Sequence, residues 1–160
     1  MAIPKSVTKV SKDGHVTYTQ SVDRVNYTIR ELTRAALRDV GKFVCKQFRN
    51  SYYAHFRKNT YKIGRATMYW VRSNTKYQKH IDLLVGISNG ENGKNPNGFY
   101  GGFQELGTSH QPRLGLFTHA AQDNIAKIIE IESQYLSALE DEARALSLIS
   151  EEDYEGNADG

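Results

Sequence analysis

Residues 99–121 read FYGGFQELGTSHQPRLGLFTHAA, and this stretch decides the fold that the sequence predicts. Its first part holds strand-forming residues interrupted by glycines, which in a strand mark a bulge or a close backbone approach. Gly107 can adopt the positive φ that ends a strand, and the Thr108 hydroxyl can turn the chain. Pro112 holds the preceding residue extended, and an apolar helical pattern follows. The stretch therefore predicts a strand over residues 100–106, a turn, and the start of a long helix.

The rest of the chain predicts an α+β fold. Asp13-Gly14 is a strong turn signal, so residues 6–20 are expected to form a β-hairpin. Hydrophobic periodicity predicts helices and strands elsewhere. The expected helices cover residues 22–57 and 116–148, and the expected strands cover 67–74, 81–87 and 100–106. We expect an antiparallel β-sheet of about four to five strands packed with two long α-helices, with residues 81–87 as a central strand.

The same patterns predict which side chains face the core. In the strand at residues 67–74, alternation places Met68, Trp70 and Arg72 on one face and Tyr69 and Val71 on the other. Apolar residues spaced by three or four positions predict the core stripe of the first helix. That stripe consists of Val25, Ile29, Leu32, Ala36, Val40, Val44 and Phe48.

Three regions are expected along the chain. Residues 1–20 form an N-terminal hairpin arm, residues 21–149 form the α+β domain, and residues 150–160 form an acidic, flexible tail.

Composition limits the class of protein. The chain has 160 residues with 39% hydrophobic and 24% charged residues, which is typical of one globular domain. No apolar run approaches the roughly 20 residues that a membrane helix needs, and the N-terminus lacks the apolar core of a signal peptide. The single Cys45 cannot form an internal disulfide, and we expect a protein made in a reducing cytoplasm.

Charge is divided unevenly between the two halves of the chain. Residues 1–80 hold 17 Lys and Arg against 4 Asp and Glu, or +13, whereas residues 81–160 hold 4 against 14, or −10. The two halves can pair within one monomer as solvated helix faces of opposite sign. Alternatively, the basic surface of one subunit can contact the acidic surface of its neighbour, a head-to-tail contact that closes into a ring when the rotation allows.

In the head-to-tail hypothesis, the basic surface is a row of cations on the first helix. Like charges four residues apart repel on a helix, so the row favours an anionic partner, although a solvated face explains it equally well. The hypothetical subunit interface joins this row to acidic residues near the C-terminus: Arg30, Arg34, Arg38, Lys42 and Lys46 on one side, and Glu130, Glu132, Glu140, Asp141 and Glu142 on the other.

No catalytic, cofactor or metal site is expected from the sequence. The five histidines are scattered without metal-ligand spacing, and no phosphate-binding loop or nucleophile elbow occurs. Residues 50–61 mix aromatic and basic side chains, which can stack on bases and bind phosphates but more often form the packed end of a helix. Glu105 lies among apolar residues, so its carboxylate is expected to need an Arg or backbone amides as partners.

The segment at residues 99–121 resembles the siphophage head–tail connector family, whose members are called neck, tail-component or tail-completion proteins. In that family a strand with an aromatic residue leads into Glu-x-Gly-Thr, a short loop with proline, and an apolar helix start. Here Glu105-Leu106-Gly107-Thr108 matches the first part letter for letter. Arg113 is displaced by about one position, and Gly115 stands where the family has proline. The motif residues carried over are Glu105, Gly107, Thr108, Pro112, Arg113 and Phe117.

The resemblance implies a structural virion protein without enzymatic activity or cofactor. It implies a ring, expected as a hexamer, that joins the head-closure protein to the tail terminator or tail tube protein. Viral DNA would pass through the lumen without sequence recognition, and the protein would assemble in the bacterial cytoplasm without a membrane. Two alternatives stay open: a tail terminator of the same interface, and a basic nucleic-acid-binding module or small ribonuclease-like toxin, for which steep salt dependence of binding is the discriminating property.

Overall fold

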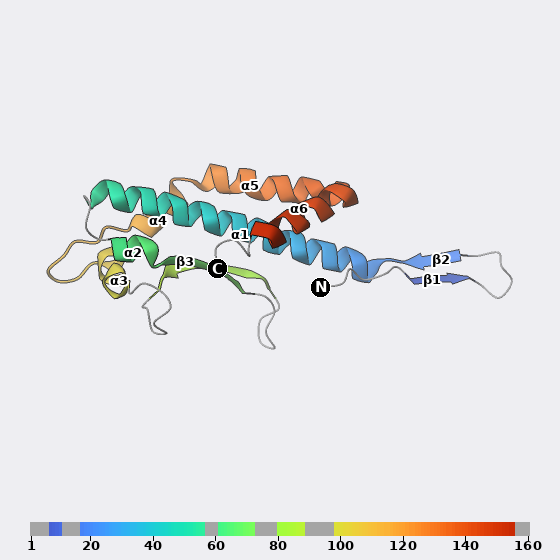
Figure 1. Ribbon diagram of the computed structural model, residues 1–160, viewed down its shortest axis with the longest axis horizontal. Coiled ribbons are helices and arrows are strands. Elements are labelled where there is room, and N and C mark those ends of the chain that lie inside the picture. Colours follow the sequence, from blue (N-terminus) through green and yellow to red (C-terminus); the bar gives the residue numbers. More distant parts are fainter. Residues whose placement is uncertain (1–6, 11–16, 57–60, 73–79, 89–97, 156–160) are drawn as a thin grey trace. The chain divides into compact units, whose positions relative to one another are not determined.

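The computed structural model describes residues 7–10, 17–56, 61–72, 80–88 and 98–155 (Figure 1). The chain divides into two compact units, one of Met1–Ala35 with Ser133–Gly160 and the other of Ala36–Glu132. The elements in chain order are β1 (Val7–Val10), β2 (Thr17–Gln20), α1 (Val22–His55), α2 (Tyr61–Arg65), β3 (Thr67–Arg72), β4 (Asp82–Ile87), α3 (Phe99–Leu106), α4 (Leu116–Gln122), α5 (Ile125–Ser137), the 3-10 helix η1 (Ala138–Glu140) and α6 (Glu142–Glu155).

The N-terminal hairpin lies in the first unit. β1 pairs antiparallel with β2, with Val7 opposite Gln20 and Val10 opposite Thr17. This pairing confirms the predicted hairpin, whose Asp13-Gly14 turn lies outside the described residues. The two strands pair with each other in a sheet of their own and do not join β3 and β4.

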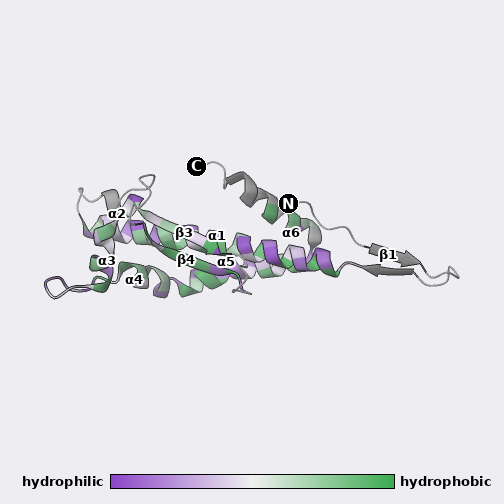
Figure 2. Ribbon diagram, turned by 90° about the horizontal axis from the view of Figure 1, so that it is seen from below, coloured by the Kyte–Doolittle hydropathy of each residue, from purple (hydrophilic) through white to green (hydrophobic). Residues whose placement is uncertain are grey.

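Helix α1 runs close to its predicted bounds and carries hydrophilic and hydrophobic residues in turn along its length (Figure 2). The predicted core stripe is buried from Leu32 to Phe48, and Tyr52 continues it at 1% exposure. The stripe is wrong at its start, because Val25 and Ile29 are 51% and 43% exposed. Periodicity identifies an apolar face, but it cannot show where along a helix that face finds a packing partner.

The core of the second unit forms between α1, the β3–β4 sheet and α4. Gly41 lets α1 approach the sheet, because a Cβ at this position would lie 2.7 Å from the Tyr69 ring. Figure 1 shows β3 running beside this part of α1. The buried members of the core are Val40, Val44, Phe48, Tyr52, Ile63 and Ala120.

Arg49 of α1 ties the next segment to this core. Its Nε and Nη2 donate to the backbone oxygens of Gly64 and Thr67, each at 3.1 Å. These carbonyls lie at the end of α2 and the start of β3, where α-helical carbonyls lack intrahelical partners. Arg49 therefore fixes the turn from α2 into the sheet.

The β3–β4 sheet has two antiparallel strands, with Thr67 opposite Ile87 and Arg72 opposite Asp82. Both strands were predicted from the sequence, and β3 shows the expected alternation of exposed and more buried residues. The sheet of four to five strands is wrong, because each described sheet has only two strands. β4 is therefore an edge strand and not the predicted central one.

The segment at residues 99–106 is the main correction to the fold class. It forms the helix α3, which ends with the Gly107 amide donating to the Phe103 oxygen at 2.8 Å. Gly101 packs α3 against β4, since a Cβ there would lie 2.5 Å from Ile87 Cδ1. The glycines that suggested a strand bulge instead allow a helix to approach a strand closely.

The single long C-terminal helix predicted over residues 116–148 is also wrong. Between α4 and α5, the Asn124 side chain donates to the Ala120 oxygen at 3.0 Å and competes with the helical backbone pattern. Asp141 is extended (φ −128°, ψ 108°), and its carboxylate accepts the amide of Ala143 at 2.9 Å, which starts α6. The fold is therefore mostly helical, with one long helix and several short ones.

α6 extends to Glu155, so the first part of the predicted flexible tail is helical, and residues 156–160 lie outside the described ones. No helix in the part of the chain that the structure describes is long and apolar enough to cross a membrane.

Candidate interaction surfaces

Glu105 joins α3 to the start of α4. Its carboxylate accepts hydrogen bonds from the Phe117 amide at 2.9 Å, from the Thr118 amide at 3.1 Å and from the Thr118 hydroxyl at 3.0 Å. The first amides of a helix lack intrahelical acceptors, and a carboxylate there also interacts favourably with the helix dipole. The backbone amides expected as partners of this half-buried carboxylate are thus present.

The loop between α3 and α4 is held by its own hydrogen bonds. The Thr108 hydroxyl accepts from the amides of His110 and Gln111, and the Leu114 amide donates to the Gln104 oxygen at 2.9 Å. Gly107 has φ 80°, and a Cβ there would lie 2.9 Å from the Arg113 nitrogen. Within Glu105-Leu106-Gly107-Thr108, therefore, Glu105 caps a helix, Gly107 supplies the positive φ and Thr108 supplies the hydroxyl that holds the turn.

The remaining motif residues act at the start of α4. The Arg113 guanidinium donates to the Thr118 hydroxyl at 3.1 Å, and Gly115 has φ 59° as the residue that precedes the helix. The Phe117 ring stacks on Phe48 of α1, with centroids 3.8 Å apart. Glu105 and Phe117 thus fix α4 to α3 and to α1, respectively.

The cation row of α1 has acidic partners on the same helix. Arg34 pairs with Glu31 at 2.9 Å, and Lys42 lies 3.6 Å from Asp39. These pairs are one turn apart, so they offset part of the repulsion along the row. Arg30 and Lys46 are exposed, so both ends of the row face solvent.

The acidic residues of the proposed interface have varied surroundings. Glu130 pairs with Lys127 at 2.8 Å, Glu132 is half-buried, and Glu140 is exposed. Asp141 caps α6, and the side chain of Glu142 lies outside the described ones. Both rows are divided between the two units, because the boundaries fall after Ala35 and after Glu132.

The aromatic and basic segment at residues 50–61 is largely a packing element. Tyr52 is buried, and its ring lies 4.7 Å from that of Phe56, which packs against the core. Rings in this position are unavailable for stacking on nucleic-acid bases. Tyr53 and His55 remain exposed, while Arg57 and Lys58 lie outside the described residues.

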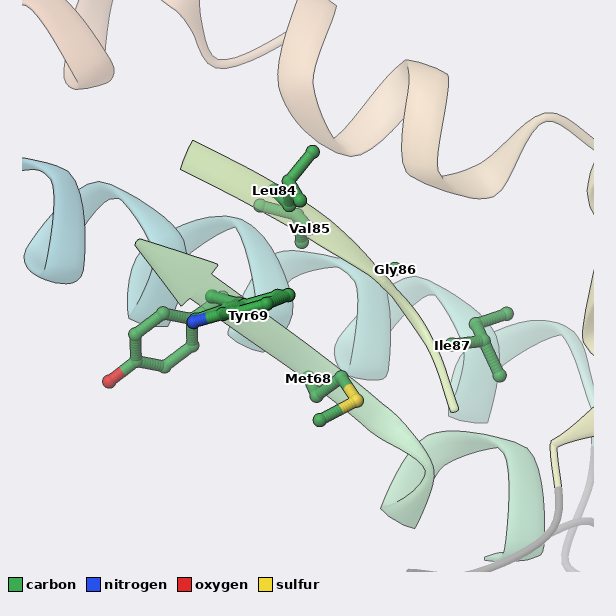
Figure 3. Close-up of a pocket in the computed structure, with 7 residues that line it drawn as sticks. Met68, Tyr69, Leu84, Val85, Gly86 and Ile87 are labelled. Carbon is green, nitrogen blue, oxygen red and sulfur yellow. The ribbon is translucent and has the colours of Figure 1, made fainter. Parts of the chain in front are cut away.

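One side of the β3–β4 sheet carries apolar residues that the second unit leaves uncovered. We call Met68, Trp70, Leu84 and Gly86 the sheet face. Cross-strand pairing places Met68 beside Gly86 and Trp70 beside Leu84. Trp70 is 64% exposed, and a Cβ at Gly86 would meet nothing within 4 Å. A hollow of about 470 Å³ is lined by these residues and their strand neighbours (Figure 3).

Helix α3 carries a second exposed apolar surface, which we call the α3 face. Its rings contact one another, with centroids 5.3 Å apart for Phe99 and Phe103. Its members are between 43% and 75% exposed: Phe99, Tyr100, Phe103 and Leu106. Ile87 lines one end of the hollow but belongs to the core-facing side of β4, where it packs against Gly101 of α3.

Sequence reasoning recognised the alternation in β3 but missed the exposed apolar surfaces. The available signal was the presence of Met68 and Trp70 on the face opposite Tyr69 and Val71, which makes both faces of the strand apolar. A strand that is apolar on both faces is typical of burial on both sides. In this unit α1 covers one side only.

In the described part of the chain, no group of three or more His, Cys, Asp and Glu is placed to hold a metal ion. Burial raises the pKa of the Cys45 thiol to about 11, although the nearby Arg49 lowers it in part. Cys45 is therefore a protonated core residue at neutral pH.

Comparison with known proteins finds no matching family model, no matching curated protein and no matching solved structure. The motif at residues 99–121 thus remains a resemblance carried by its own residues.

Proposed function

We propose that this chain is a structural subunit of the neck of a long-tailed bacteriophage. Copies of it form a ring between the head-closure protein and the tail, and DNA passes through the ring. The hexamer implied by the resemblance is part of this proposal, as is assembly in the bacterial cytoplasm. The protein works through its contacts with neighbours and makes or breaks no covalent bond.

The observation that carries the proposal is the way the motif residues cooperate in one junction. The Glu105 carboxylate binds two amides of α4, while Gly107 and Thr108 shape the loop that brings α4 back to α3. Glu105, Gly107 and Thr108 each have a geometric role, which supports the resemblance. The element that leads into the motif departs from the family pattern, because it is the helix α3 where the family has a strand.

The charge division supports assembly between copies. A basic row and an acidic row on one chain give complementary surfaces, which favour one register and one orientation between neighbours. Head-to-tail contacts of this kind generate rings when the rotation closes. The salt bridges within α1 reduce, but do not remove, the excess of positive charge along the row.

The proposal is tested in a phage that encodes this chain, by placing a stop codon early in its gene. We expect lysates that contain filled heads and separate tails, with joined particles restored when the wild-type chain is supplied from a plasmid. A plasmid carrying the stop codon is the matched control. Joined, infectious particles that lack the chain would contradict the proposal.

A further inference from the structure

We infer that one water molecule is bound between α1 and α3, where it bridges the Tyr52 hydroxyl and the side-chain oxygen of Gln104. This inference goes beyond the neck proposal, since it needs only the packing within the unit of Ala36–Glu132. Two observations carry it: a pair of buried polar atoms without hydrogen-bond partners, and a small cavity that both of their residues line.

The two polar atoms are the Tyr52 hydroxyl oxygen on α1 and Gln104 Oε1 on α3. Tyr52 is 1% exposed, and within the described part of the chain neither atom has a hydrogen-bond partner. A buried hydroxyl or amide oxygen that stays unpaired costs free energy. Nearly all such atoms in folded proteins are therefore paired with protein groups or with ordered water.

A cavity lined by residues of both helices has room for the missing partner. Its volume is about 10 Å³, which is the space that one water molecule needs and too little for a larger ligand. Tyr52, Gln104 and Glu105 supply the polar part of its wall, while Phe48 and Leu116 belong to the apolar part. Purely apolar cavities stay dry, so the polar residues are what favours water here.

The wall can supply three hydrogen bonds, the number that a buried water molecule usually makes. The Tyr52 hydroxyl donates to the water, and the water donates one proton to Gln104 Oε1. Its second proton goes to the Glu105 carboxylate, whose Oε2 accepts one other bond, from the Phe117 amide. Each carboxylate oxygen can accept two hydrogen bonds, so this contact leaves the cap on α4 intact.

The bound water connects α1 to the residue that caps α4. Glu105 follows Gln104 in the last turn of α3, so a bridge that holds this turn against Tyr52 also holds the carboxylate in place. The stacking of Phe117 on Phe48 ties the same part of α1 to α4. The water is therefore a polar link in a junction whose other contacts with α1 are apolar.

A high-resolution crystal structure of the full-length protein tests the site directly. We expect one ordered water molecule within about 3.2 Å of both Tyr52 Oη and Gln104 Oε1. A direct hydrogen bond between the Tyr52 and Gln104 side chains overturns the inference. A cavity without solvent density between them overturns it as well.

Two substitutions remove the partners of the water with little change of shape. Tyr52→Phe removes the hydroxyl, and Gln104→Met removes the amide while keeping the length of the side chain. Magnetic relaxation dispersion of the water oxygen counts long-lived water molecules in solution, and the double variant should hold one fewer than the wild type. Tyr100→Phe is the matched control, because it removes a hydroxyl from an α3 side chain that is 72% exposed. It should leave the count unchanged.

An equal count in the wild type and the folded double variant overturns the inference, as does the same loss in Tyr100→Phe. Far-UV circular dichroism establishes that the variants are folded, and urea unfolding closes a double-mutant cycle. Because both groups act through one bridge, the second substitution should change the unfolding constant at least about threefold less when the first is present. Strictly additive effects overturn the inference.

Discussion

At the scale of single residues, the most consequential side chain is Glu105. Its carboxylate replaces the missing acceptors of two amides at the start of α4. A hydrogen bond to a charged group contributes more than a neutral one, and the amides cannot find another acceptor without rearrangement of the loop. The sequence predicted an Arg or backbone amides as partners but not which element supplies them, because Glu105 was expected in a strand of the sheet and not near the end of a helix.

Glu105→Ala should lower the free energy of unfolding by about 1–3 kcal/mol, because it leaves the half-buried amides of Phe117 and Thr118 without their acceptor. Urea denaturation measures this change. Glu130→Ala is the control, since Glu130 makes an exposed pair with Lys127 and its loss should cost under about 1 kcal/mol. Equal midpoints for Glu105→Ala and the wild type would contradict the role of Glu105 as a cap.

Cys45 gives the protein a pH-dependent stability at high pH. Burial raises its pKa to about 11 from an ordinary value of 9.0. Between these values the unfolded chain loses the thiol proton and the folded chain keeps it, so the free energy of unfolding falls as pH rises from about 9 to 11.

This slope is measured by urea unfolding at several pH values in reducing buffer. Cys45→Ala should remove part of it, because the titrating thiol is absent, whereas tyrosines and lysines titrate in both proteins. Identical slopes for Cys45→Ala and the wild type would show that the thiol does not contribute.

At the scale of elements, local sequence patterns correctly predicted the features that depend on neighbouring residues alone. The hairpin pairing, the extent of α1 and the alternation in β3 follow from turn residues and from period, and the structure has all three. The helix at residues 99–106 was missed, because its aromatic residues favour strands and the residue that faces the core is Gly101, which has no apolar side chain. Ile87 and Ile63, both distant in sequence, make that glycine necessary, because a Cβ there would lie 2.5 Å and 3.2 Å from them.

Hydrophobic periodicity also could not predict the breaks between the C-terminal helices. Asn124 and Asp141 are residue types that compete with a helical backbone or cap a new helix. The apolar spacing on both sides of them nevertheless reads as one continuous stripe. How many strands join a sheet is likewise decided by tertiary pairing, which is why two strands replace the expected four or five.

Two glycines in helices make a matched test of close packing. At Gly41 a Cβ would meet the Tyr69 ring at 2.7 Å, whereas at Gly102 in α3 it would meet nothing within 4 Å. Gly41→Ala should destabilise the protein by about 1–3 kcal/mol through overpacking. Gly102→Ala should stabilise it by about 0.5–1 kcal/mol, because alanine favours helices more than glycine does.

Thermal and urea unfolding of both variants give the comparison. Stabilisation by both substitutions would contradict the close approach of α1 to β3.

At the scale of the whole molecule, the charge division is the feature that suits assembly between copies. The charged rows of α1 and of residues 130–142 suit a head-to-tail contact, which can continue around a ring. The sheet face and the α3 face consist of other residues, so substitutions in the charged rows leave these apolar surfaces unchanged.

Reversing two charges of the basic row tests the head-to-tail contact. Arg34→Glu with Arg38→Glu should prevent the joining of heads to tails in complemented lysates, because like charges would then face each other across the interface. The variant should remain folded, which far-UV circular dichroism checks.

Adding Glu130→Arg and Glu140→Arg to this variant should restore joining in part, since it re-establishes opposite charges between neighbours. Joined particles at wild-type yield with the reversed row alone would show that the row takes no part in assembly.

The central claim is that copies of this chain form the ring between head and tail, and imaging of the assembled particle tests it most directly. Electron cryomicroscopy of phage particles that carry this chain should show a closed ring of density at the head–tail junction. The unit of Ala36–Glu132 should fit into this density once per subunit. A junction whose rings are fully occupied by other proteins, or density for this chain elsewhere in the particle, would contradict the account.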